Sequence, residues 1–125
     1  MGPVMFECVI PGKVGVKKNQ RRLIFRGRFP LSLPSTKYLH WESVALRHVN
    51  KSKQGMILCE LEARFEFHFK NKQAEVDIDN CLGGPLDLLQ KAGVIKNDKQ
   101  VRRVIAEKFF DSEPMVKVEL VQYER

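Results

Sequence analysis

Two aspartates separated by one apolar residue form the most distinctive chemical pattern of the chain. They lie in the run Val76-Asp77-Ile78-Asp79-Asn80, and a third aspartate, Asp98, follows nineteen residues after Asp79. Because residues i and i+2 of an extended backbone point to the same side, we expect both carboxylates to project together, with Ile78 turned toward the core. Two close carboxylates repel each other unless a cation separates them. The pattern therefore predicts a site for Mg²⁺ or Mn²⁺, with Asp98 arriving from a later loop.

A divalent ion held there would suit phosphodiester hydrolysis. It would polarise the scissile phosphate, lower the pKa of a water molecule and stabilise the leaving oxygen, and two ions can divide these tasks. The sequence does not choose between one ion and two. The chain has 22 Lys and Arg against 15 Asp and Glu, a net charge of +7 at pH 7, which favours a polyanionic partner. A cluster of acids that can bind a metal ion, in a chain whose Lys and Arg residues can bind phosphate, indicates a nuclease.

Other interpretations of the acid pair stay open at this point. Asp and Asn are common in helix caps and turns, so the pair could be purely structural. The calcium-loop template is not met, because Cys81 and Leu82 occupy its third-ligand and glycine positions. The metal-binding DxD of nucleotide-sugar transferases needs a nucleotide-binding domain, which we do not expect in this short chain, and so we expect no nucleotide cofactor.

Basic residues gather in two places that could contact DNA. One group falls within twelve residues on an expected loop and hairpin, and the other precedes the acids. Each neutralised phosphate would add to affinity and to its salt dependence. A solvated charged loop is the alternative. The candidates are Lys17, Lys18, Arg21, Arg22, Arg26, Arg28, Lys70 and Lys72.

The composition indicates a cytoplasmic protein without a membrane span. Cys8, Cys59 and Cys81 are odd in number and form no CxxC pair, which favours free thiols in a reducing compartment. No apolar run approaches the ~20 residues that cross a bilayer. The first residues lack the basic and apolar regions of a signal peptide.

The elements that must position these residues are expected to form one α+β domain over residues 1–125. The first half predicts a strand over 4–10, a basic loop over 11–22 and a short hairpin with glycine at its turn, after which Pro30 and Pro34 break the chain. A helix over 36–49, capped by Ser35 or Thr36, has Tyr38, Trp41, Ala45, Leu46 and Val49 on one face.

The second half begins with a strict alternation over 56–69, which predicts a strand with one buried and one wet face. The helix after the acids is expected to begin near Pro85, because proline suits a first turn, and to end at Gly93. Residues 101–110 and 115–122 predict a terminal β-hairpin. The whole order gives a mixed sheet with helices packed on it.

Taken as a longer unit, these residues resemble the RusA family of Holliday junction resolvases. The resemblance is closest over residues 76–104, and looser but collinear elsewhere. It implies a small homodimeric endonuclease that cuts four-way DNA junctions with Mg²⁺ or Mn²⁺ in recombination and repair, often encoded by bacteria or phages. Asp77, Asp79 and Asp98 match the family's metal-binding acids, Asn80 follows the pair, and Asp87 matches a structural acid. The matching segments are Asp77-Ile78-Asp79-Asn80, Asp87-Leu88-Leu89, Lys91-Ala92-Gly93 and Asn97-Asp98-Lys99-Gln100-Val101.

The chain departs from the family at one position. The family usually has a catalytic lysine four residues after the second aspartate, and here that residue is Gly83. Lys72, Lys96 or Lys99 could approach from neighbouring loops, but the sequence cannot place them. The chain is therefore expected to be an active junction resolvase or, alternatively, a branched-DNA-binding protein of the same fold that cuts poorly. A metal-dependent nuclease acting on flaps or RNA is a third, more distant reading.

Overall fold

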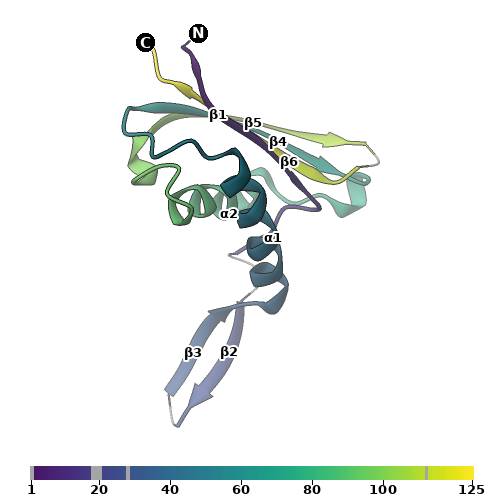
Figure 1. Cartoon of the computed structure of the whole chain (residues 1–125). Helices are drawn as coiled ribbons and strands as arrows, with labels where there is room; N and C mark the ends of the chain where they lie inside the picture. The colour runs from purple at the N-terminus through teal and green to yellow at the C-terminus, as the bar shows by residue number, and fades with distance from the viewer. Residues whose placement is uncertain (1, 18–20, 28, 112) are drawn as a thin grey trace.

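The computed structural model describes residues 2–17, 21–27, 29–111 and 113–125, and it describes only the backbone of strands 21–26 and 29–34. These residues form a single small α+β domain with a four-stranded mixed sheet and two α-helices, as predicted. Figure 1 shows the order of the elements along the chain. They are β1 Val4–Pro11, β2 Arg21–Arg26, β3 Phe29–Pro34, α1 Thr36–Ser52, β4 Leu61–Phe69, η1 Lys72–Ala74, α2 Ile78–Lys91, η2 Asp98–Gln100, β5 Val101–Phe110 and β6 Met115–Gln122.

The four-stranded sheet has the order β1-β6-β4-β5. Strand β4 runs parallel to β5 and antiparallel to β6, and β6 is antiparallel to β1. The predicted terminal hairpin is therefore wrong, because β4 separates β5 from β6. Helix α2 carries the chain back along the sheet, so that β5 can pair in parallel with β4. The connection after β5 then crosses the end of β4.

Strand β4 is shorter and more deeply buried than its alternation predicted. It begins at Leu61, and Ile57 makes only an isolated bridge to Ile95. Glu62 and His68, expected on a wet face, are 5% and 7% exposed. A central strand has neighbours on both sides, and their long side chains cover it. Glu62, for example, accepts hydrogen bonds from Arg103 of the neighbouring β5 and from Arg64 of β4 itself.

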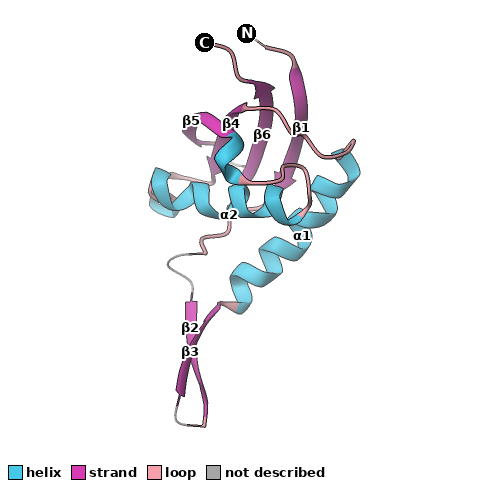
Figure 2. Ribbon diagram, turned by 90° about the vertical axis from the view of Figure 1, so that its left-hand side faces the viewer, coloured by secondary structure: helices cyan, strands magenta, loops and turns pink. Residues whose placement is uncertain are grey.

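Both helices lie on one side of the four-stranded sheet (Figure 2). Helix α1 begins where the Ser35 hydroxyl accepts a hydrogen bond from the Tyr38 amide at 3.1 Å, and it continues three residues beyond the predicted end. Its apolar face joins the core, as its spacing predicted: Tyr38, Trp41, Ala45 and Val49 are buried. Among the described residues, no helix is long and apolar enough to cross a membrane.

Strands β2 and β3 form a separate two-stranded sheet that projects beyond the start of α1 (Figures 1 and 2). The hairpin turns at Gly27, whose φ of 64° favours glycine. Pro30 and Pro34, expected to break the chain, instead pair with Phe25 and Arg21 within the ribbon. Proline is tolerated here because one edge of each strand in a two-stranded ribbon needs no N–H partner.

Candidate active site

The acid pair lies at the start of α2 rather than at the end of a strand. Asp77 is the N-cap residue and Asp79 lies in the first helical turn, so the predicted extended arrangement is wrong. Ile78 is 38% exposed instead of facing the core. The Asp77 carbonyl accepts hydrogen bonds from the Asn80 and Cys81 amides, but its side chain makes no capping bond. Asp77 therefore caps the helix through its backbone, and its carboxylate remains able to bind another partner.

Helix α2 begins at Ile78 and runs through Gly83, Gly84 and Pro85, whereas the sequence predicts a start near Pro85. Close packing explains the small residue at position 84. A Cβ atom on Gly84 would lie 2.8 Å from the carbonyl oxygen of Gly15, in the loop after β1. A Cβ on Gly15 would in turn lie 2.6 Å from the Trp41 ring. The glycines therefore allow the loop to pack directly against both helices.

The segment before α2 is held by a lysine from the sheet. The Lys108 ammonium of β5 donates to Glu75 Oε1 at 2.9 Å and to the Val76 carbonyl at 3.3 Å. The hydrogen bond and charge of Glu75 outweigh burial and raise the pKa of Lys108, so this contact stays charged at neutral pH. It fixes the approach of the chain to Asp77.

A pocket of about 450 Å³ opens beside α2. Helix α2 supplies most of its wall, because positions 79, 80, 83, 86 and 87 recur at helical spacing and share one face. The described lining residues include three carboxylates and one lysine. They are Lys17, Asp79, Asn80, Gly83, Leu86, Asp87 and Asp98. The structure thus brings Asp79, Asn80 and Asp98 together, whereas Asp77 lies outside this lining.

Asp98 is presented by a short turn with dense hydrogen bonding. Its amide donates to Gln90 Oε1 of α2 at 3.1 Å. Asn97 and Gln100 cap the turn reciprocally. The Gln100 side chain also donates to the carbonyls of Ile57 and Cys59 at 2.8 and 3.1 Å. Sequence reasoning missed this role of Gln100, although an Asn97-x-x-Gln100 pattern is a recognisable capping box.

Lys17 enters the pocket from the loop after β1. Its ammonium lies 3.3 Å from Asp87 Oδ2. Lys91 approaches the same carboxylate at 3.8 Å and lies 3.0 Å from Glu42. The sequence places Lys17 among the candidate DNA contacts and does not link it to the acids. No local pattern could reveal that link, because 70 residues separate Lys17 from Asp87.

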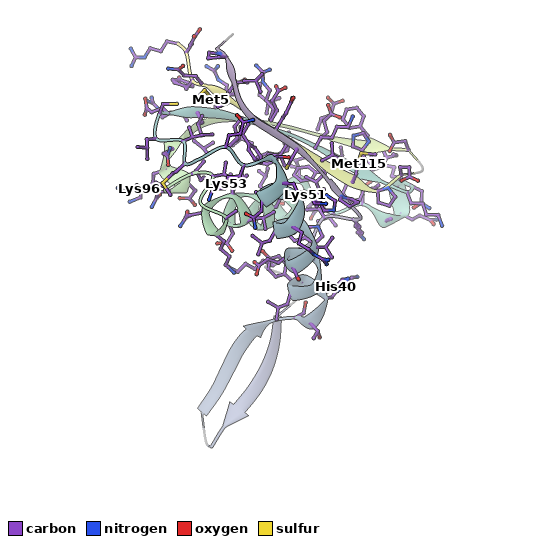
Figure 3. The ribbon with its side chains drawn as sticks, in the orientation of Figure 1. Met5, His40, Lys51, Lys53, Lys96 and Met115 are labelled. Atoms are coloured by element: carbon purple, nitrogen blue, oxygen red, sulfur yellow. The ribbon has the colours of Figure 1, made fainter. Side chains whose placement is uncertain are left out.

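For the other predicted basic residues, the structure shows no side chain in the pocket among those that it describes. Lys18 and Arg28 lie outside the described residues, and for Arg21, Arg22 and Arg26 only the backbone in β2 is described. Lys70 and Lys72 are exposed just after β4. Lys72, Lys96 and Lys99 are exposed and do not line the pocket; Lys96 lies at the outer edge of the domain in Figure 3.

The donor set suits a hard divalent cation. Among the described residues, no three His, Cys, Asp or Glu side chains lie close enough to complete a metal site by themselves. Mg²⁺ is often held by one or two carboxylates, with water and substrate phosphate filling the remaining positions. Asp79 and Asp98, with the Asn80 amide beside them, fit that pattern.

Cys81 lies under the acid pair but is not suited to bind an ion. Burial raises the pKa of its thiol to about 11. The nearby charge of Lys108 lowers this pKa, and the charges of Asp77 and Asp79 raise it by smaller amounts. A neutral, fully buried thiol contributes packing to the start of α2.

Comparison with known proteins identifies the family of the chain. Among curated proteins, none matches the chain at a significant level. The sequence profile of the family described as Endodeoxyribonuclease RusA matches residues 11–121, which include the loop with Lys17, the acid pair and Asp98. Because the match covers most of its length, the chain belongs to the RusA family of endodeoxyribonucleases.

Proposed function

We propose that this protein resolves four-way DNA junctions by paired, symmetric phosphodiester hydrolysis that depends on Mg²⁺ or Mn²⁺. The observation that carries the proposal is the pocket beside α2, which Asp79, Asp98 and Lys17 line in a chain of an endodeoxyribonuclease family. Carboxylates bind the cation, and the lysine attracts phosphate.

Asp79 and Asp98 would hold the ion from two separate elements, and Asp77 would add its carboxylate from the N-cap. Such an ion supplies positive charge to the oxygens of the scissile phosphate. The backbone of Asn80 positions Asp79, because its N–H donates to Asp79 Oδ1 at 3.0 Å. Gln90 and Gln100 position Asp98 through the hydrogen bonds around η2.

The DNA arms would be held by the basic residues outside the pocket. Lys18, Arg21, Arg22, Arg26 and Arg28 would bind backbone phosphates near the β2–β3 hairpin, and Lys70 and Lys72 would bind them near the acids. We propose a homodimer, because a four-way junction needs two symmetric cuts and a two-fold dimer offers two pockets.

A second function deserves a test because of Gly83. This residue lines the pocket, and a Cβ atom there would meet nothing within 4 Å. The resemblance places the family's lysine at this position. Without a cation there, the protein would grip branched DNA by shape and charge and would cut it slowly.

The deciding experiment uses an end-labelled synthetic four-way junction with Mg²⁺, Mn²⁺ or EDTA, with duplex and RNA of equal length as competitors. An active resolvase makes paired symmetric nicks that need metal and disappear in D79N and D98N. Glu113→Gln removes the same charge outside the pocket and should cut normally. Retarded but uncut junction in every metal would instead establish the binding protein, and preferred cleavage of RNA would contradict both.

A further inference from the structure

We propose that Lys17 supplies, from the loop after β1, the cation that Gly83 cannot supply from α2. The inference rests on the proposed function and names the residue that stabilises charge on the scissile phosphate. Lys17 would thus take the role of a lysine at position 83, although it lies 66 positions earlier in the chain.

The position of Lys17 in the pocket suits this role. Asp79, Gly83 and Asp87 lie one turn apart on the same face of α2, and all three line the pocket. A lysine at position 83 would project from this face, between the two acids. Lys17 reaches the same face from the loop after β1, since its ammonium lies 3.3 Å from Asp87 Oδ2. The space left by the missing side chain is therefore next to a cation from another element.

The packing of the Lys17 loop also suits this role. The loop that bears Lys17 is packed, because Val14 and Val16 are each 4% exposed and Gly15 contacts Gly84 and Trp41. The Gly12 amide also donates to the Pro114 carbonyl at 3.0 Å. A lysine on a loosely held loop would lose conformational freedom on binding phosphate. Lys17 is held near its working position before the DNA arrives.

The Lys17 ammonium is also accessible to a phosphate group. The Lys17 side chain remains 36% exposed beside Asp87. An ammonium group has three N–H donors, and the contact with Asp87 uses one. The remaining donors can face a phosphate oxygen near Asp79 and Asp98. Asp87 is then a positioning residue, which holds Lys17 on the pocket wall.

The test measures junction binding in EDTA and single-turnover cleavage in Mg²⁺ for the full-length protein. We expect K17Q to cut roughly 100- to 1,000-fold more slowly, as for loss of one donor to a developing oxyanion. Its junction affinity should fall by less than about threefold, because many phosphates are contacted. K17R should recover part of the rate. Lys51→Gln, in the last turn of α1 (Figure 3), removes the same charge and should cut like the wild type.

The decisive variant combines K17Q with G83K. Lysine at position 83 should restore cleavage by at least tenfold in the K17Q background and change the wild-type rate little. Thermal unfolding of each variant checks that it is folded. The inference is overturned when folded K17Q cuts normally, when binding and cleavage fall in parallel, or when G83K fails to rescue K17Q.

The wild-type result separates this inference from the proposed function. A wild-type protein that binds junctions without cutting, and gains cleavage through G83K, overturns the role of Lys17 and supports the binding protein. A wild-type protein that neither binds nor cuts junctions overturns both proposals.

Discussion

Gly84 and Gly15 lie so close together that a Cβ atom on Gly84 would stand 2.8 Å from the Gly15 carbonyl oxygen. This contact joins α2, which bears Asp79, to the loop that bears Lys17. We expect Gly84→Ala to push the two apart, to lower the free energy of unfolding by about 1–3 kcal/mol and to slow cleavage. Urea unfolding and single-turnover cleavage measure the two effects.

Gly83→Ala provides the matched control, because its Cβ would meet nothing within 4 Å. Alanine is the better helix former, so this variant should gain about 0.5–1 kcal/mol of stability. Equal stability losses in the two variants would show that helix geometry, and not the contact with Gly15, constrains this segment.

Lys17 and Asp87 should behave as a coupled pair in a double-mutant cycle. Both side chains are about a third exposed, so the pair should add no more than about 1 kcal/mol to stability. We expect D87N alone to slow cleavage about tenfold and to add little in the K17Q background. Lys91→Gln removes the other lysine near Asp87 and should have a smaller effect on the rate. Additive losses in the cycle would refute a positioning role for Asp87.

Gln100 should matter for both folding and cleavage. In Gln100→Ala the carbonyls of Ile57 and Cys59 and the amides of Lys96 and Asn97 lose their partner. We expect a stability loss of about 1–3 kcal/mol and slower cleavage through a displaced Asp98. Gln54→Ala, at an exposed position, is the control. Unchanged unfolding in Gln100→Ala would show that the turn holds its shape without this side chain.

Divalent metal should stabilise the folded protein if the acids bind it. An ion at about 100 times its dissociation constant adds about 2.7 kcal/mol of stability. We expect Mg²⁺ to raise the Tm of the wild type and EDTA to reverse the rise. The double variant D79N/D98N should not respond. A wild-type Tm that is indifferent to millimolar Mg²⁺ and Mn²⁺ would contradict the proposed ligands.

Stability should also depend on pH through His68. Burial lowers the pKa of the ring, but the hydrogen bonds and charges of Glu66 and Asp111 outweigh this and raise it above 6.5. A folded-state pKa above the unfolded value stabilises the fold fully below about pH 6.5, and this contribution is lost as pH rises through the folded pKa. Urea unfolding between pH 5.5 and 8.5 should show the decline. His68→Gln should flatten it, and an equal decline in that variant would point to another group.

The local elements could be predicted from the sequence because their signals are local. The stripe from Tyr38 to Val49 and the Ser35 cap define α1, and Gly93 ends α2 at a φ of 72°. The start of α2 could not be predicted, since proline and two glycines argue against a helix there. Tertiary packing reverses that preference: Gly84 is the residue that lets the loop at Gly15 approach.

Contacts between distant residues were beyond prediction for the same reason. Two adjacent strands at the end of a chain usually pair, yet β4 lies between β5 and β6. The acids were found from their spacing, and Asp79 and Asp98 do share a pocket, but the direction of Asp77 depends on where the helix begins. Lys17, which contacts Asp87, lies 70 residues earlier in the chain.

Strand β1 finds its partner only in the last strand, with Val4 opposite Val121. Pairing over such a sequence separation is slow, because the intervening loop must close first. During synthesis on the ribosome, β1 and the loop with Lys17 emerge first. Strand β6, with which β1 pairs, is made much later. The two acids belong to a local β-α-β unit from β4 to β5, whereas the lysine is tied to β1. We therefore expect the acids and Lys17 to come together late in folding, when β1 pairs with β6.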